Sequence, residues 1–498
     1  MEIWLQIISE LRKYEFIPLS STSHFFRKLS LPILFHTIRF AAIGDPPTAQ
    51  RLLEMKSWAS VGVLENIVEI QFTRTKYVAA SHDQPDVLAI LHSMPKLRTV
   101  SLGMGSASNA NLLHILRHPT LHKLMLKGTS YVRGMPMISR LPKRSKLVHL
   151  ILNDIKPSLW VQNFLSEIAP QLETLEISFL PSEHPIHGHF LIPPISSTLH
   201  SSSHDVKSCP HLRSFTFQSP YSLPRAWDNN LYTFLSTHPE IKYLSLLNVL
   251  HPAACGHLPR LSLPNLVELA TNLPLENTTD QSPLFGNLNR VRKLYLKDVV
   301  GLGTSLPRLE DLLAKSCAGV EQMHLTLDPT CNTEDLFGVL ARSSRRLRVL
   351  QLDVSNRARP MGSHRVSNGQ GETEVSNPFL SFPTVDSEDA DTFGKPSPPA
   401  HIPRLPCLQR ITVDVTMQGP DYKLAYGLIF AWFDMLLRPG CPALHTVEVD
   451  AWQESQDGER EMNAGLCAPE WWIKWWRVGD GDDWREEQST GKIEGLSN

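Results

Sequence analysis

Residues 121–126 read LHKLML, residues 147–152 read LVHLIL and residues 347–352 read LRVLQL. Each hexapeptide has large apolar residues at its first, fourth and sixth positions. The fourth and sixth positions differ by two, so in a β-strand their side chains point to one face, and the side chain between them points to the other. Each hexapeptide therefore predicts a short strand with one buried face and one face in contact with solvent.

The same apolar triplet recurs along nearly the whole chain. Its thirteen units begin at Ile67, Leu97, Leu121, Leu147, Leu172, Leu212, Ile241, Leu266, Val291, Val320, Leu347, Leu408 and Leu444, and Phe35 is a possible fourteenth start. In one unit, Thr271 stands in the third apolar place. Most steps between starts are 24–30 residues long, which is close to the period of leucine-rich repeats, roughly 20–29 residues.

The segments between the triplets have a helical period, as at Leu309, Leu312 and Leu313. Proline stands two residues before many triplets, for example at Pro239 and Pro264, where it ends a helix and favours extended chain. Stacked units of this kind bury their triplets between a parallel sheet and an outer layer of helices. The predicted fold class is therefore α/β, a leucine-rich-repeat solenoid, with a small all-α segment at the N-terminus.

Two long steps between triplets predict insertions. The first lies at 181–204 and is rich in Pro, His and Ser; the second, at 355–403, is rich in Pro, Ser, Gly and acidic residues and is expected to be disordered. The predicted domains are a helical segment at 1–40, the solenoid at 41–354, the disordered insertion at 355–403, the final repeats at 404–450, and a C-terminal cap and tail at 451–498.

The C-terminal cap is predicted from residues 471–476, which read WWIKWW. A cap is expected there because the last edge of the sheet needs protection. An aromatic ligand platform and a membrane-interface anchor are the alternatives for this run.

Residues 1–40 combine helical apolar stripes with a Pro-Leu-Ser turn, which is typical of a small helical cap on a repeat array. They also contain EIW at 2–4, IISEL at 7–11, LSSTSHFFR at 19–27 and LFHTI at 34–38. These motifs resemble an F-box, and with the repeats that follow them the chain resembles the F-box/leucine-rich-repeat family. The F-box is shortened, since Met1 occupies the place where the family usually has a proline.

The resemblance implies that the N-terminal segment docks on a Skp-type adaptor, which joins a cullin, and that the repeats hold a protein substrate. The adaptor-binding residues that it implies are Ile3, Trp4, Ile7, Leu11, Leu19 and Phe25. The expected function is the substrate-recognition adaptor of an SCF-type ubiquitin ligase. The alternative is a non-ubiquitin leucine-rich-repeat scaffold whose F-box remnant is only an N-terminal cap.

Strand alternation also predicts where a substrate binds, because the third and fifth positions of each hexapeptide face away from the core. The expected substrate-binding residues on this face are Lys123, Met125, Tyr243, Lys293, Tyr295, His324 and Arg410, since Tyr, Met and Arg are common interface anchors. Lysines such as Lys123 and Lys293 come early, whereas Asp353, Asp414, Glu448 and Asp450 come late. We therefore expect a bipolar groove and a solvated acidic stripe rather than catalytic carboxylates.

The composition argues against several other functions. With 48 basic and 50 acidic residues the formal charge is −2, which favours neither nucleic acid nor a membrane surface as partner. Seven scattered cysteines without a CxxC pair predict reduced thiols in the cytoplasm or nucleus. The chain has no P-loop, GxSxG, HExxH or dinucleotide fingerprint, so neither an enzyme nor a cofactor is expected.

A metal site is the remaining chemical alternative. Histidines and cysteines are common zinc ligands, and the candidates here are His184, His187, His189, His200, His204 and Cys209. Because these residues form no paired ligand motif, we expect a polar insertion enriched in His, and no metal.

Overall fold

The computed structural model describes residues 11, 15–43, 50–51, 54–55, 57, 62–75, 90–105, 109–129, 146–155, 164–165, 168–179, 209–218, 231, 234–247, 262–271, 288–299, 305–315, 317–327, 333–354, 404–417, 440–453, 471–477 and 484–490. The chain divides into two compact units, Met1–Ile241 (unit 1) and Lys242–Asn498 (unit 2). The described helices are all too short or too polar to cross a membrane.

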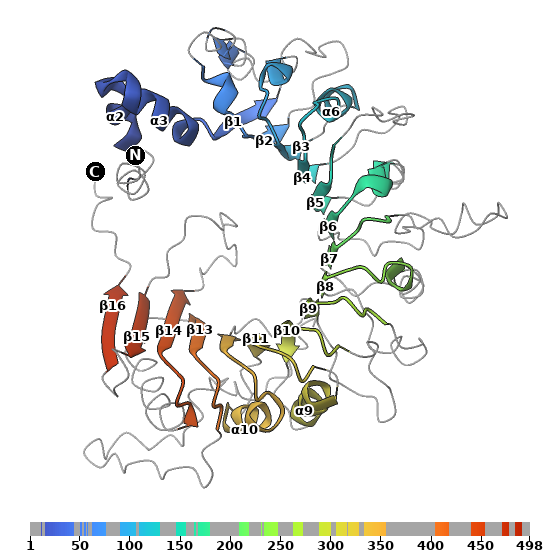
Figure 1. Cartoon of the computed structure of the whole chain (residues 1–498), viewed down its shortest axis with the longest axis vertical. Coiled ribbons are helices and arrows are strands. Elements are labelled where there is room, and N and C mark those ends of the chain that lie inside the picture. Colours follow the sequence, from blue (N-terminus) through green and yellow to red (C-terminus); the bar gives the residue numbers. More distant parts are fainter. Residues whose placement is uncertain are drawn as a thin grey trace, which may run out of the picture. The chain divides into compact units, whose positions relative to one another are not determined.

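The described part of unit 1 contains two α-helices before its first strand, α2 (Phe16–Thr22) and α3 (His24–Leu34). Parallel strands follow in chain order (Figure 1): β1 (Thr37–Ile43), β2 (Glu69–Thr75), β3 (Thr99–Gly105), β4 (Lys123–Thr129), β5 (His149–Ile155), β6 (Thr174–Phe179) and β7 (Ser214–Gln218). The connections contain short helices, namely η3 (Leu64–Asn66), η5 (Ile90–Ser93), α6 (Asn109–Leu116) and η6 (Ala169–Gln171).

Unit 2 continues the same pattern with parallel strands in chain order: β8 (Tyr243–Leu247), β9 (Glu268–Thr271), β10 (Lys293–Val299), β11 (Gln322–Leu327), β12 (Val349–Val354), β13 (Arg410–Met417) and β14 (Thr446–Gln453). Helices α9 (Ser305–Lys315) and α10 (Thr333–Ser343) lie on one side of these strands (Figure 1). Strands β15 (Trp471–Arg477) and β16 (Trp484–Thr490) end the unit as antiparallel additions.

The apolar triplets form the core, as predicted. Their second residues are all at most 3% exposed: Ile70, Val100, Leu124, Leu150, Leu175, Phe215, Leu244, Leu269, Leu294, Met323, Leu350, Ile411 and Val447. They stand opposite one another on adjacent strands, so that Leu350 pairs with Met323 on one side and Ile411 on the other. The predicted α/β fold of parallel strands and short helices is thus confirmed within each unit.

A hydrogen-bonded turn precedes the strands, and the sequence analysis did not predict it. The N–H of the first triplet residue donates to the carbonyl three residues earlier, as from Leu347 to Ser344 at 3.0 Å and from Leu408 to Leu405 at 3.2 Å. The residue whose carbonyl accepts this hydrogen bond has a buried side chain, whether that side chain is apolar or polar. These residues are Leu64, Met94, His118, Cys209, His238, Leu263, Leu288, Cys317, Ser344, Leu405 and Cys441. In the part of the chain that the structure describes, eleven repeats therefore have a fourth core position.

Adjacent repeats are also joined at this turn. The carbonyl of Arg348 accepts from the N–H groups of both Gln409 and Arg410, at 2.8 and 3.0 Å. One repeat earlier, the carbonyl of Glu321 accepts hydrogen bonds from the N–H groups of Arg348 and Val349 in the same way. The arrangement is identical although 27 residues separate Val320 from Leu347 and 61 separate Leu347 from Leu408.

The two ends of the chain differ from the prediction in detail. The possible fourteenth triplet forms strand β1, in which Ile38 pairs with Ile70 and Phe40 with Phe72, so the sheet begins inside the segment predicted to be helical. The C-terminal run predicted as a cap forms β15, paired antiparallel with β14. The 355–403 insertion and residues 1–10 lie outside the described residues.

Candidate functional site

Strands β10 to β14 of unit 2 present three rows of side chains on the face opposite the core. The first row contains Lys293, Gln322, Val349, Arg410 and Thr446; the second contains Tyr295, His324, Gln351, Thr412 and Glu448; the third contains Thr326, Asp353, Asp414 and Asp450. Neighbouring strands of a sheet are about 4.8 Å apart, so each row is a closely spaced ladder of side chains. We call this surface the sheet face of unit 2.

An aromatic pair occupies one end of the second row. The rings of Tyr295 and His324 have centroids 4.4 Å apart and planes inclined at 58°. The Tyr295 hydroxyl lies 3.5 Å from Oγ1 of Thr326. Burial lowers the pKa of His324, while the carboxylate of Asp414 acts in the opposite direction. His324 is therefore mostly neutral at pH 7, and it supplies a flat aromatic surface rather than a cation.

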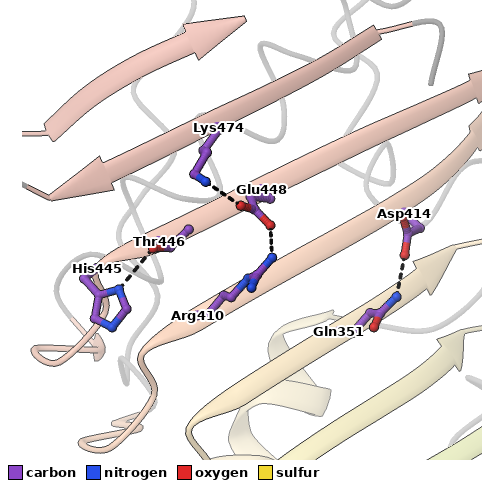
Figure 2. A network of polar contacts seen from close by, with 7 residues as sticks. All are labelled: Gln351, Arg410, Asp414, His445, Thr446, Glu448 and Lys474. Carbon is purple, nitrogen blue, oxygen red and sulfur yellow. Dashed lines mark hydrogen bonds and ion pairs between the residues drawn. The ribbon is translucent and has the colours of Figure 1, made fainter. Parts of the chain in front are cut away.

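An ion-pair network occupies the other end of the second row (Figure 2). Nζ of Lys474 on β15 lies 2.8 Å from Oε1 of Glu448, and Nη2 of Arg410 donates to Oε2 of the same carboxylate. Burial alone would raise the pKa of Glu448, but the hydrogen bonds from Lys474 and Arg410 outweigh it and hold that pKa below its ordinary value. Glu448 is thus an ionised centre between two cations, and the three side chains fix one another.

The third row is acidic. Asp353, Asp414 and Asp450 stand directly opposite one another on β12, β13 and β14. Asp414 accepts a hydrogen bond of 2.8 Å from Nε2 of Gln351 (Figure 2). Burial raises the pKa of Asp450, and the charges of Asp414 and Glu448 raise it further. Like charges on adjacent strands repel one another, so a cationic group placed beside this row would stabilise it.

The predicted substrate-binding residues fall into two sets. Tyr243, Lys293, Tyr295, His324 and Arg410 belong to unit 2 and lie on its outward strand positions, and Tyr243 is 46% exposed. Lys123 and Met125 belong to β4 in unit 1, where they stand opposite His149 and Ile151 of β5. Lys293, Tyr295, His324 and Arg410 therefore lie on the sheet face of unit 2, and Tyr243 on β8 continues its first row two strands before Lys293.

The predicted separation of charge is altered by pairing. Nζ of Lys293 lies 3.6 Å from a carboxylate oxygen of Glu268 on β9, so this lysine has an acidic neighbour on the same face. Arg410 and Lys474 likewise share Glu448. The cations named here thus all have a carboxylate neighbour, and the acidity of the face is concentrated in its third row.

Gln351 and Lys474, which bind carboxylates of the sheet face, were missed by the sequence analysis. Gln351 occupies the fifth position of its hexapeptide, so the period alone could have found it. Lys474 could not be found in this way, because its place beside Glu448 depends on the antiparallel register of β14 and β15.

The helices α2 and α3 form a second candidate surface, in unit 1. The Ser23 hydroxyl caps α3 by accepting a hydrogen bond of 3.2 Å from the N–H of Phe26. Large apolar side chains remain exposed on this pair: Ile17 at 63%, Phe25 at 44% and Ile33 at 37%. A hollow beside them is lined by Ile17, Ser20, Ser21, Arg27, Leu31, Leu34, Phe35 and Val63.

The predicted adaptor-binding residues are only partly described. Phe25 is exposed, and Leu11 and Leu19 are partly buried. Ile3, Trp4 and Ile7 lie outside the described residues.

The candidate metal ligands give no site in the part of the chain that the structure describes. Within it, no group of three or more His, Cys, Asp or Glu side chains is arranged to hold a metal ion. Cys209 is buried at the turn before β7, and its N–H donates to Nε2 of His238 at 3.2 Å. The five histidines from His184 to His204 lie outside the described ranges.

No protein-family model matches the chain, and no curated protein matches it. Among solved structures, the chain is similar to the crystal structure of a TLR13–ssRNA13 complex, with 13% sequence identity and a TM-score of 0.34. The match covers 80% of this chain and 48% of the other, so this chain spans about half the length of that one.

Proposed function

We propose that the chain is a non-catalytic leucine-rich-repeat protein that binds a protein partner on the sheet face of unit 2. The observation that carries the proposal is the alignment of Tyr295, His324 and Arg410 on this face, with Tyr243 on β8 continuing its first row and a row of carboxylates beside them. Tyr and Arg dominate the energetics of many interfaces because they combine apolar area with directed hydrogen bonds.

The shape of the face also favours a protein over a small ligand. The four intervals between β10 and β14 span roughly 19 Å at the usual strand spacing. Small molecules bind mainly in concave sites that enclose most of their surface, whereas a protein partner covers a broad area of about 800 Å². The fixed network of Arg410, Glu448 and Lys474 would be preformed for such a partner, which reduces the entropy lost on binding.

Affinity purification from cell extract followed by mass spectrometry tests this proposal. The double variant Lys293→Glu with Tyr295→Ala should lose partners that the native chain captures. Lys28→Glu, an exposed substitution on α3, is the control and should retain them. Retention of every partner by the double variant would refute the assignment of the binding face, provided that both variants unfold at the temperature of the native chain.

A more specific function is the substrate-recognition adaptor of an SCF-type ubiquitin ligase. The exposed Ile17, Phe25 and Ile33 favour it, because a segment that served only as a cap would bury such side chains against the first repeat. Phe16, at 2% exposure, already anchors the helices. This surface would receive the Skp-type adaptor, which brings the cullin, and the sheet face of unit 2 would receive the substrate.

Co-purification with a Skp-type adaptor and a cullin separates this function from that of a scaffold. Phe25→Asp, and separately Ile3→Asp with Ile7→Asp, should abolish the association, while Lys28→Asp should preserve it. If the native chain brings down neither protein, the ligase role is wrong, and protein binding by unit 2 is still tested by its own variants.

A further inference from the structure

The edge of unit 2 at which its strands begin carries a group of exposed arginines. Arg290 lies in the turn before β10, Arg345 and Arg346 in the turn before β12, Arg348 directly before β12, and Arg404 directly before the turn to β13. We call these five residues the arginine edge. They lie at the starts of the strands, whereas the third, acidic row of the sheet face lies toward the strand ends.

The arginine edge is continuous from β12 to β13. The carbonyl of Arg348 accepts hydrogen bonds from Gln409 and Arg410, so the turns that carry Arg346 and Arg404 belong to adjacent repeats. From β10 to β13 the edge spans three strand intervals, about 14 Å.

Among the described residues, Glu321 is a carboxylate beside this edge, next to Arg348 on the adjacent strand. Glu321 is engaged by Arg292, 3.7 Å away, and Arg290 donates to the amide oxygen of Asn265 at 3.2 Å. Within the described ranges, Arg345, Arg346, Arg348 and Arg404 form no ion pair. Four guanidinium groups therefore lie in or beside two adjacent turns, and the described residues form no ion pair with them.

Other arginines of unit 2 behave differently. Nε and Nη2 of Arg342 bind the two oxygens of Glu310 at 2.7 and 3.0 Å, joining α10 to α9. Arg410 binds Glu448. Guanidinium groups favour this forked pairing with carboxylates, and the arginine edge offers the same donors to a carboxylate that comes from outside.

We infer that the arginine edge binds an acidic segment of a partner protein, rich in Asp and Glu. An extended segment advances about 3.3 Å per residue, so four or five residues cover the edge. A long nucleic acid fits less well, because the whole chain is slightly acidic at −2 and the carboxylates of Asp353, Asp414 and Asp450 lie on the same repeats. This inference goes beyond the proposed function, since it concerns a different surface.

Fluorescence anisotropy with the full chain tests the inference. The probe is a labelled peptide of six glutamates flanked by Gly and Ser, compared with the same peptide carrying six glutamines. The native chain should bind the first and not the second, more weakly as salt rises. The variant R345Q/R346Q/R348Q should bind it at least tenfold more weakly, whereas K28Q/R51Q/R485Q, which removes three exposed cations elsewhere, should stay within twofold of the native chain.

Several results would overturn the inference. These are failure of the native chain to bind the glutamate peptide, equal weakening by the two triple variants, or tighter binding of a twelve-nucleotide oligouridine that also depends on Arg345, Arg346 and Arg348. Thermal unfolding checks that the variants are folded, and the single variant Arg404→Gln, which should weaken binding two- to threefold, guards against loss of structure in the triple variant.

A final experiment tests whether the arginine edge is occupied by a partner protein or by the chain itself. Residues 386–391 read DSEDAD. If the glutamate peptide binds only after the four acidic residues of this stretch are replaced by Asn and Gln, the arginine edge is occupied by the chain's own acidic stretch, and the inference of a partner is wrong.

Discussion

Replacing Thr271 with valine is expected to stabilise the protein by about 1–2 kcal/mol. Thr271 is fully buried and lies between Leu246 and Leu296 on the adjacent strands. Its Oγ1 atom is buried and has no hydrogen-bond partner among the described residues. A buried hydroxyl without a partner costs roughly 1–3 kcal/mol. Valine keeps the branched shape that a strand favours and puts a methyl group among leucines.

Urea unfolding followed by circular dichroism measures this effect as a higher midpoint at constant m-value. Thr326→Val is the matched control, because Thr326 is also buried but its Oγ1 lies 3.5 Å from the Tyr295 hydroxyl. That variant should gain nothing or lose stability. Thr271→Ser should lose about 1 kcal/mol, since it removes a buried methyl group and keeps the hydroxyl. A lower midpoint for Thr271→Val would refute the reasoning, because it would mean that Oγ1 makes a stabilising hydrogen bond.

Four further predictions concern the cap, the charges and the thiols. Ser23→Ala removes the N-cap of α3 and should cost about 1 kcal/mol, measured as faster hydrogen exchange of its first amides. Glu448→Gln should destabilise the protein at pH 7. Because the folded pKa of Glu448 is lowered, the ionised side chain contributes its full stabilisation above the unfolded pKa, about 4.3. This stabilisation is lost as pH falls through the folded pKa. Asp450→Asn should act in the opposite sense, since the folded pKa of Asp450 is raised: it should stabilise the protein at neutral pH, with a difference that vanishes below about pH 3.9. In native protein, iodoacetamide should modify the exposed Cys407 and spare the buried Cys317, whose pKa is raised to about 12 by burial, as peptide mass mapping can show.

The parallel strands were predictable because a single physical signal, apolar side chains two positions apart, repeats from unit to unit. Thr271, the exception to the apolar pattern, also lies in a strand, between two leucines of the adjacent strands. The fourth core position was not predictable in this way. It is filled by residues as different as Cys209, His238 and Ser344, which share a turn geometry and no common hydrophobicity.

The sequence pattern predicted which face of the sheet carries the candidate site, but not which side chains on that face pair with one another. Alternation placed Tyr295 and His324 on the outward side, where the structure finds them. Whether Lys293 meets Glu268 depends on the register of β9 and β10, and whether Glu448 meets Lys474 depends on an antiparallel strand. Register arises from contacts between distant segments, and local period does not encode it.

The double hydrogen bond to the carbonyl of Arg348 has a consequence for how such a chain can change. Gln409 and Arg410 bond to the carbonyl of Arg348 as Arg348 and Val349 bond to that of Glu321, although the connection before Gln409 is much longer. The length of chain between two repeats can therefore vary without altering the pairing of their strands. Sequence can then be gained or lost between repeats while the residues of the sheet keep their neighbours. A one-residue deletion within a strand, by contrast, would shift the side chains beyond it in that strand to the opposite face.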